Sequence, residues 1–257
     1  MKKTIFITIF FSLFCHITGQ NNLYLIYEFM RVDNEQEGTY MDIETFWQKI
    51  HEERVKNGDI IGWDLWRLQP GGEDQGYQYL TVNLYDDKVK MMSGAGDFWK
   101  AVTQAYPNLS EEKLNEKFNQ TSKSRDLAVR LYVEQVDKTE DEFEVSVGTV
   151  AIFHMMQAVE GKYWEYEEGE RKAWKTWHQQ QVDNNTKGSW KFNRIMMPSN
   201  NHASHITVNM FKNWDQRYME SPAGPKLSAS TRRALNKGVL AREVKNVYQA
   251  VLIRQVR

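Results

Sequence analysis

Glu28 and His154 are the residues whose types and positions best suit proton transfer. Glu28 interrupts an apolar run over residues 23–32, and His154 interrupts a similar run over residues 149–156. A carboxylate and an imidazole are natural partners in general acid and base catalysis. His51, in a predicted helix, is a third catalytic candidate. An ion pair with a structural role accounts for Glu28 and His154 equally well.

A second group of polar side chains has the composition of a small-molecule site. Side chains alternate between two faces along a strand, so the apolar Leu80 and Val82 place Tyr79 and Asn83 on the other face. We expect the apolar set to face the helices and the polar set to line a space between two sheets, which suits a ligand. The predicted ligand-binding residues are Arg67, Tyr79, Asn83, Arg130, His178, Arg194, His205 and Asn209. Packing between strands explains several of them without a ligand.

The sequence predicts neither a metal nor a cofactor. His202 and His205 lie close together but have no third ligand nearby, and the only cysteine is Cys15. The sequence has no phosphate-binding glycine loop, dinucleotide fingerprint, nucleophile elbow or HExxH motif. The glutamate-rich residues 165–170 and the charged run 111–117 are expected to be solvent-exposed helix faces.

The sequence also repeats itself. Trp47, His51, Val55, Asn57, Trp63 and Arg67 recur as Trp174, His178, Val182, Asn184, Trp190 and Arg194, each 127 residues later (174 − 47). The Thr-Val-Asn of residues 81–83 recurs at 207–209, an offset one residue shorter. These identities in register indicate a duplication. We predict a first unit over residues 20–138, a linker over 139–145 and a second unit over 146–257.

Each unit shows the same predicted order of elements, β-α-β-β-α-β. Strands are expected at 23–32, 60–68, 77–85 and 128–136, and again at 149–156, 190–196, 205–211 and 247–256. A helix with an aromatic residue and a histidine follows the first strand of each unit. A second helical stretch falls at about 97–118, interrupted at Pro107, and at about 231–245. This order is the ferredoxin-like motif.

Two such units in tandem resemble the dimeric α+β barrel superfamily, which includes antibiotic-biosynthesis monooxygenases, NIPSNAP-like and EthD-like proteins and L-rhamnose mutarotases. The resemblance covers nearly all of residues 22–257. It implies an α+β fold in which the two ferredoxin-like units pack sheet to sheet within one chain. Haem-handling proteins of this fold need an axial histidine and often a distal arginine. His178 and Arg194 are the candidates here, and no motif fixes either of them.

The N-terminus has the layout of a secretory signal peptide. Lys2 and Lys3 precede an apolar run over residues 5–14 and small residues at 18–19. We therefore expect residues 1–19 to be removed and the protein to be secreted or periplasmic. A lipid anchor on Cys15 is not expected, because the bulky Phe14 precedes it.

The charge balance gives no basis for a nucleic-acid reader. The chain has 33 Lys and Arg against 34 Asp and Glu, a formal net charge of -1. We expect no nucleic-acid partner, no membrane association after signal removal and a small-molecule ligand, with homo-oligomer formation open.

Three functions fit these observations. The first is a small-molecule-binding protein that holds its ligand between the two sheets. The second is a cofactor-independent monooxygenase or a sugar epimerase or mutarotase, with Glu28, His154 or His51 moving a proton. The third is a structural or interaction module whose barrel is filled with side chains. Fold does not decide among them.

Overall fold

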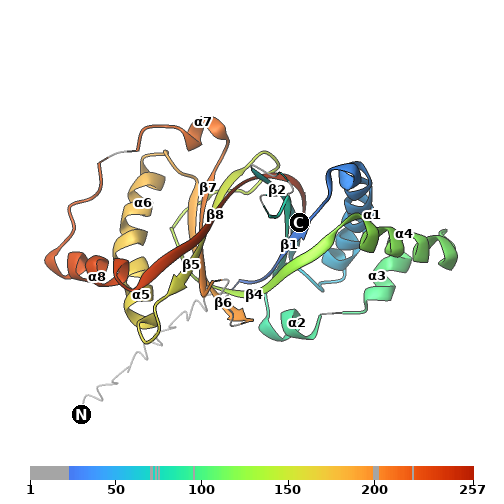
Figure 1. Ribbon diagram of the computed structural model, residues 1–257, viewed down its shortest axis with the longest axis horizontal. Helices are drawn as coiled ribbons and strands as arrows, with labels where there is room; N and C mark the ends of the chain where they lie inside the picture. The colour runs from blue at the N-terminus through green and yellow to red at the C-terminus, as the bar shows by residue number, and fades with distance from the viewer. Residues whose placement is uncertain are drawn as a thin grey trace, which may run out of the picture.

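The computed structural model describes residues 23–69, 72, 74, 76–94, 96–198, 203–221 and 223–257 (Figure 1). The predicted signal peptide, residues 1–19, lies outside the described residues, as does His202. Among the described residues, no helix is long and apolar enough to cross a membrane.

Strands of the described chain form one closed antiparallel barrel (Figure 1). The first unit contributes β1 (Tyr24–Arg31), β2 (Gly62–Gln69), β3 (Tyr79–Tyr85) and β4 (Asp126–Lys138). The second unit contributes β5 (Val150–Ala158), β6 (Ser189–Met197), β7 (His205–Phe211) and β8 (Arg242–Val256). Around the barrel the order is β1-β3-β2-β8-β5-β7-β6-β4. Each unit thus supplies four adjacent strands, and the units join at the β2–β8 and β4–β6 pairs. The predicted fold is confirmed.

Helices cover the outside of the barrel on two opposite sides (Figure 1). The first unit has a 3-10 turn η1 (Asn34–Gln36), α1 (Glu37–Lys56), α2 (Lys88–Ser93), α3 (Phe98–Ala105) and α4 (Glu111–Ser124). The second unit has α5 (Tyr163–Gly169), a π-helical turn η3 (Glu170–Trp174), α6 (Lys175–Asp183), α7 (Trp214–Arg217) and α8 (Ala229–Val239). The helix predicted to reach residue 245 ends at Val239, because the chain from Arg242 pairs with β5 as strand β8.

Helix starts follow the local sequence where a capping side chain is present. Ser110 Oγ accepts a hydrogen bond from the backbone N–H of Lys113 at 3.3 Å and begins α4. Asp97 accepts from the backbone N–H of Lys100 at 3.1 Å and begins α3. Such caps satisfy backbone donors that the first helical turn leaves free. Between these two helices the chain leaves the helical path before Pro107, as predicted.

An apolar core fills the barrel, and this corrects the predicted assignment of faces. Leu80, Val82 and their counterparts Ile206 and Val208 belong to one buried cluster drawn from both units. Within it, Phe153 of β5 contacts Trp66 of β2 and Tyr27 of β1, with ring centroids 5.6 and 6.1 Å apart. The apolar set therefore faces inward rather than toward the helices. Apolar side chains make up most of the interior, and a few polar ones, Asp64, Lys191, Asn193 and Arg257, lie among them.

The polar set lies on the opposite face, beneath the helices. Tyr79 and Trp63 cluster with Tyr40 of α1. In the second unit, Trp190 clusters with Tyr166 of α5. Trp63 and Trp190 therefore lie outside the barrel, not between the two sheets. Any ligand site built from the polar set must therefore lie outside the barrel.

The π-helical turn explains why the repeat spacing changes along the chain. Tyr40 and Glu44 precede their counterparts Tyr166 and Glu170 by 126 residues (166 − 40), whereas Trp47 and Trp174 are 127 apart. The π-turn at Glu170–Trp174 accommodates the one extra residue inside an otherwise helical path. The first unit follows the equivalent path as the uninterrupted helix α1.

Candidate functional site

A cavity of about 590 Å³ lies between α1 and the outer face of the first unit's sheet. We call it the α1 pocket. Its aromatic lining residues are Trp47, Trp63, Tyr85, Phe98 and Tyr132, and its polar ones include Glu28, Glu44, His51, Arg54, Thr81, Asn83, Arg125 and Arg130. Helix α1, the end of α2 and the start of α3 form one wall, and strands β1 to β4 form the other. An apolar hollow with convergent polar groups is the usual form of a small-molecule site.

Glu28 is tied to the sheet by two neighbours. Arg130 Nε and Nη2 lie 2.7 and 2.6 Å from Glu28 Oε1, and Thr81 Oγ1 donates to Oε2 at 3.2 Å. The Arg130 side chain is 48% exposed, so water weakens this ion pair. The carboxylate is therefore held in place but can exchange its partner for a ligand.

His51 is held between indole rings. Its ring centroid lies 4.9 Å from that of Trp63 and 6.0 Å from that of Trp47. Burial, with the nearby guanidinium groups of Arg54 and Arg125, holds the pKa of His51 well below its usual range. The imidazole is neutral at pH 7 and can accept a proton or a hydrogen bond. The stacking also fits the packing role that a repeated aromatic-histidine pair suggests.

A buried Tyr-Glu-Arg cluster anchors α1 to the sheet. Glu44 is 1% exposed and pairs with Arg125, whose guanidinium lies 5.8 Å from the ring centroid of Tyr40. The second unit repeats the cluster as Glu170, Arg242 and Tyr166. This cluster was not predicted from the sequence, although Tyr40 and Glu44 share an offset of 126 residues with their counterparts. Duplication in both units indicates a structural role.

In the second unit, Lys187 contacts the counterparts of His51 and Asn83. Its Nζ donates to Asn209 Oδ1 at 2.6 Å and lies 2.7 Å from His178 Nδ1. His154 Nδ1 lies 3.4 Å from Asn209 Nδ2. Burial first, then the nearby Lys187, Arg242 and Arg217 lower the pKa of His154 to about 4. His154, His178 and Asn209 thus form one polar cluster around a lysine.

Glu28 and His154 are not brought together. Glu28 lines the α1 pocket of the first unit, whereas His154 joins the Lys187 cluster of the second. Their strands, β1 and β5, are not neighbours in the barrel. Glu28 and His154 occupy equivalent positions of the two units, and their side chains point outward on opposite sides of the barrel. The predicted common cavity therefore does not form. Of the other predicted catalytic residues, His51 lines the same cavity as Glu28.

Arg194 and His205 belong to a separate ionic cluster. Arg194 Nε and Nη2 each donate to Glu167 at 2.8 Å, and His205 Nε2 lies 3.1 Å from Glu167 Oε1. Despite burial, hydrogen bonds from His205 and Arg194 lower the pKa of Glu167 to about 2. Glu167 and Glu170 are therefore buried partners rather than a solvent-exposed face, because strand residues far along the chain neutralise them.

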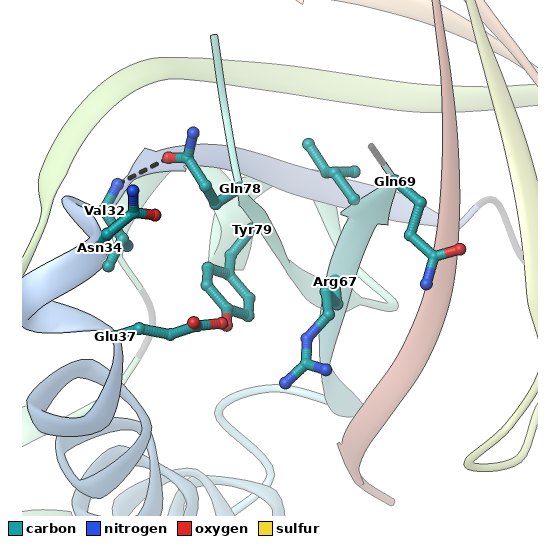
Figure 2. A pocket seen from close by; sticks show the side chains of 8 residues that line it. Val32, Asn34, Glu37, Arg67, Gln69, Gln78 and Tyr79 are labelled. Atoms are coloured by element: carbon teal, nitrogen blue, oxygen red, sulfur yellow. Dashed lines mark hydrogen bonds between the residues drawn. The ribbon is translucent and has the colours of Figure 1, made fainter. Parts of the chain in front are cut away.

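Arg67 and Tyr79 line a smaller pocket of about 220 Å³ near the start of α1 (Figure 2). Tyr79 Oη donates to Glu37 at 2.5 Å, and the Arg67 guanidinium lies 6.0 Å from the Tyr79 ring centroid. Gln78 Oε1 accepts from the backbone N–H of Val32 at 2.8 Å, as Figure 2 shows. Arg67 and Tyr79 are thus separated from the α1 pocket that holds Asn83 and Arg130.

The residues that haem would require do not fit that group. The ring of His178 stacks with Trp190 and Trp177 at 5.1 and 6.1 Å, and its Nδ1 faces Lys187. The guanidinium of Arg194 is engaged by Glu167 in the other cluster. An axial ligand and a distal arginine must face one open space, and these two do not. Among the described residues, no group of His, Cys, Asp and Glu has the arrangement of a metal site.

Solved structures resemble the chain over most of its length, whereas no family model and no curated protein matches it. A candidate monooxygenase of Fusobacterium nucleatum is 10% identical, with a TM-score of 0.54 over 92% of this chain and 94% of that one. An anthrone oxidase-like protein is 10% identical, with a TM-score of 0.52 over 91% and 92%. A variant chlorite dismutase of Candidatus Nitrospira defluvii is 8% identical, with a TM-score of 0.51 over 90% and 92%.

The chain has the dimeric α+β barrel fold. At these identities the likeness shows the fold alone. Function has to be argued from the α1 pocket and its side chains.

Proposed function

We propose that the protein binds a small molecule in the α1 pocket, outside the barrel and beneath α1. The supporting observation is the cavity of about 590 Å³ whose aromatic walls surround Glu28, Asn83 and Arg130. The barrel interior offers no comparable room, because side chains from both units fill it. A barrel interior filled with side chains agrees with the third hypothesis, a structural or interaction module. Packing of the interior does not account for the α1 pocket, which lies outside the barrel.

A thermal-shift screen of residues 20–257 against sugars, aromatic compounds and haem tests this proposal. A ligand that binds only the folded protein at a hundredfold excess over its Kd stabilises it by about 2.7 kcal/mol, or roughly 5 to 10 °C for a chain of this size. We expect Glu28→Gln to reduce the shift, because the residue lines the pocket. The matched variant His154→Gln, in the second unit, should leave it unchanged. A shift that is lost in His154→Gln but kept in Glu28→Gln contradicts the proposal.

A second candidate function is a cofactor-independent enzyme of monooxygenase or sugar-epimerising type. One observation favours it: the Glu28 carboxylate and the neutral His51 imidazole line the same pocket and could move a proton. Glu28→Gln keeps the shape of the side chain and removes the base. It should abolish turnover of any substrate found in the screen while the melting midpoint changes by less than about 2 °C. Unchanged turnover excludes Glu28 as the base.

We also propose export, with cleavage close to Gln20. The supporting observation is the Lys2-Lys3 pair ahead of the apolar run over residues 5–14. N-terminal sequencing of the exported protein should begin near residue 20, and thiol labelling should be silent because Cys15 is removed. Retention of residues 1–19 in the exported protein contradicts this.

A further inference from the structure

The two units build corresponding sites, and only the second one fills its site from within. Ile60 corresponds to Lys187 in the ungapped repeat (60 + 127). Lys187 Nζ donates to Asn209 Oδ1 at 2.6 Å and lies 2.7 Å from His178 Nδ1. The counterparts of Asn209 and His178 are Asn83 and His51, and both line the α1 pocket. Lys187 thus supplies, from within the second unit, a donor at the position where the first unit has the apolar Ile60.

The acceptor in the first unit has no such donor. Asn83 is 7% exposed, and its Oδ1 is buried without a hydrogen-bond partner among the described residues. Ile60 presents only carbon at the position of Lys187. Met91 corresponds to Arg217 (217 − 126), the cation whose charge acts on Lys187. A buried acceptor without a donor is costly, and a turn of the Asn83 amide toward the cavity would bring Oδ1 within reach of a donor that a ligand supplies.

We propose that the ligand of the α1 pocket is an aromatic molecule that donates an N–H or O–H hydrogen bond to Asn83 Oδ1. The inference rests on the proposed function, since it assumes that a small molecule occupies this pocket. Its aromatic part would lie against the partly exposed rings of Trp47, Phe98 and Tyr132, which line the same cavity as Asn83.

The charges around the pocket favour a neutral donor over an ammonium group. The carboxylates of Glu28 and Glu44 are each paired with a guanidinium, from Arg130 and Arg125. Arg54 adds a further guanidinium, 3.4 Å from His51 Nδ1. The three guanidinium groups outnumber the two carboxylates, so a positively charged ligand would be repelled. A phenol, an alcohol or an amide N–H satisfies Asn83 without that repulsion.

The test uses residues 20–257 and two matched probes, 2-naphthol and 2-methoxynaphthalene. The probes share the ring system, but only 2-naphthol has a donor. Isothermal titration calorimetry at pH 7 gives both dissociation constants. We expect 2-naphthol to bind about tenfold more tightly, because the ether leaves the buried acceptor unpaired. A ratio close to one overturns the donor proposal.

Two variants test whether Asn83 causes the preference for 2-naphthol over 2-methoxynaphthalene. Asn83→Leu should reduce the ratio to about one, whereas Asn209→Leu in the second unit should leave it unchanged, because Lys187 already saturates that acceptor. If Asn83→Leu fails to fold, Asn83→Ala, which also has no side-chain acceptor, serves in its place. A tenfold preference that persists without Asn83 overturns the proposal.

Transplanting the second unit's lysine gives an independent readout. Ile60→Lys should place an amine beside Asn83 and weaken 2-naphthol binding at least tenfold. Ile60→Met, of similar length but without a donor, should weaken it no more than about twofold. Equal weakening by both variants indicates steric blocking and overturns the proposal.

Failure of the donor inference can be told apart from failure of the proposed function. If both naphthalenes bind equally and Glu28→Gln weakens both, the pocket binds ligands but does not select a donor. If no compound in the thermal-shift screen responds to Glu28→Gln, the pocket is not a binding site, and both proposals fail.

Discussion

At the residue scale, Lys187 gives the second unit an unusual dependence on pH. Burial, followed by the charge of Arg217, lowers the pKa of Lys187 to about 7, well below the ordinary 10.5 of a lysine. Between these values the unfolded chain binds a proton that the folded chain does not. The free energy of unfolding must therefore rise as the pH rises through this window.

We expect Lys187→Met to remove that rise. Urea denaturation between pH 7 and pH 9 should show wild-type stability increasing by about 1 to 2 kcal/mol from this group. The variant should follow a flatter profile, whatever its absolute stability. Lys175→Met, which removes a surface lysine paired with Asp137, should keep the wild-type slope. A variant profile as steep as wild type would show that Lys187 is charged throughout.

The pairing of Glu44 with Arg125 gives a second prediction at this scale. Arg125→Met strands a carboxylate that is 1% exposed, which should cost about 3 to 5 kcal/mol of unfolding free energy. Arg130→Met breaks the pair with Glu28 at a guanidinium that is 48% exposed, and should cost less than about 1 kcal/mol. Chemical denaturation measures both variants. Equal costs would show that Glu44 gains water when its partner is removed.

At the residue scale, the sequence identified several residues that line the α1 pocket, but it did not show which side chains are buried or which partners they have. Glu28, His51, Asn83 and Arg130 do line one pocket. Glu167 and Glu170, predicted to be exposed, are buried because their partners come from strands β6 and β8. A run of acidic residues does not reveal a partner that lies far along the chain. The unpaired state of Asn83 is likewise a property of three-dimensional placement alone.

At the element scale, the π-helical turn is the clearest difference between the two units. Its extra residue falls between Glu170 and Trp174, where the repeat offset changes from 126 to 127. Deletion of Lys172 should convert η3 into regular helix and bring the second unit into register with α1. Lys172 makes a surface ion pair with Glu168, so its own loss is worth little.

We expect the Lys172 deletion to fold, with a melting midpoint within about 5 °C of wild type. Circular dichroism gives the midpoint, and a crystal structure of the variant shows whether the π-turn is gone. Deletion of Ala173 serves as the comparison, because that side chain is buried and its loss also removes packing. A cooperative loss of folding in the Lys172 deletion would show that the π-turn is required to place Glu170 against Arg242.

Element order could be predicted from the sequence, whereas the direction of each face could not. Alternation in residues 79–85 separates two faces of β3, but nothing local says which one meets water. In the closed barrel, the apolar face turns inward and the polar face lies beneath α1. Charged residues likewise concealed the start of β8, where Arg242 and Glu243 pair with Ala158 and Gln157 of β5.

At the scale of the whole molecule, closure of the barrel depends on two joints between the units. β2 pairs with β8, and β4 pairs with β6. Each unit alone would expose two open strand edges together with the apolar inner face that Leu80 and Val82, or Ile206 and Val208, form. Unpaired edges and large apolar faces favour association between chains.

We therefore expect residues 20–138, expressed alone, not to be a stable monomer. The chain should form dimers or larger assemblies, because a second copy can supply the inner face and the edges that residues 146–257 supply in the full protein. Light scattering after gel filtration measures the mass, with residues 20–257 as the reference. Leu80→Asp, on the inner face, should abolish folding of the isolated unit, whereas Lys123→Asp, on the exposed end of α4, should not affect assembly. A soluble, cooperatively folded monomer of residues 20–138 would contradict the view that the two units share one core.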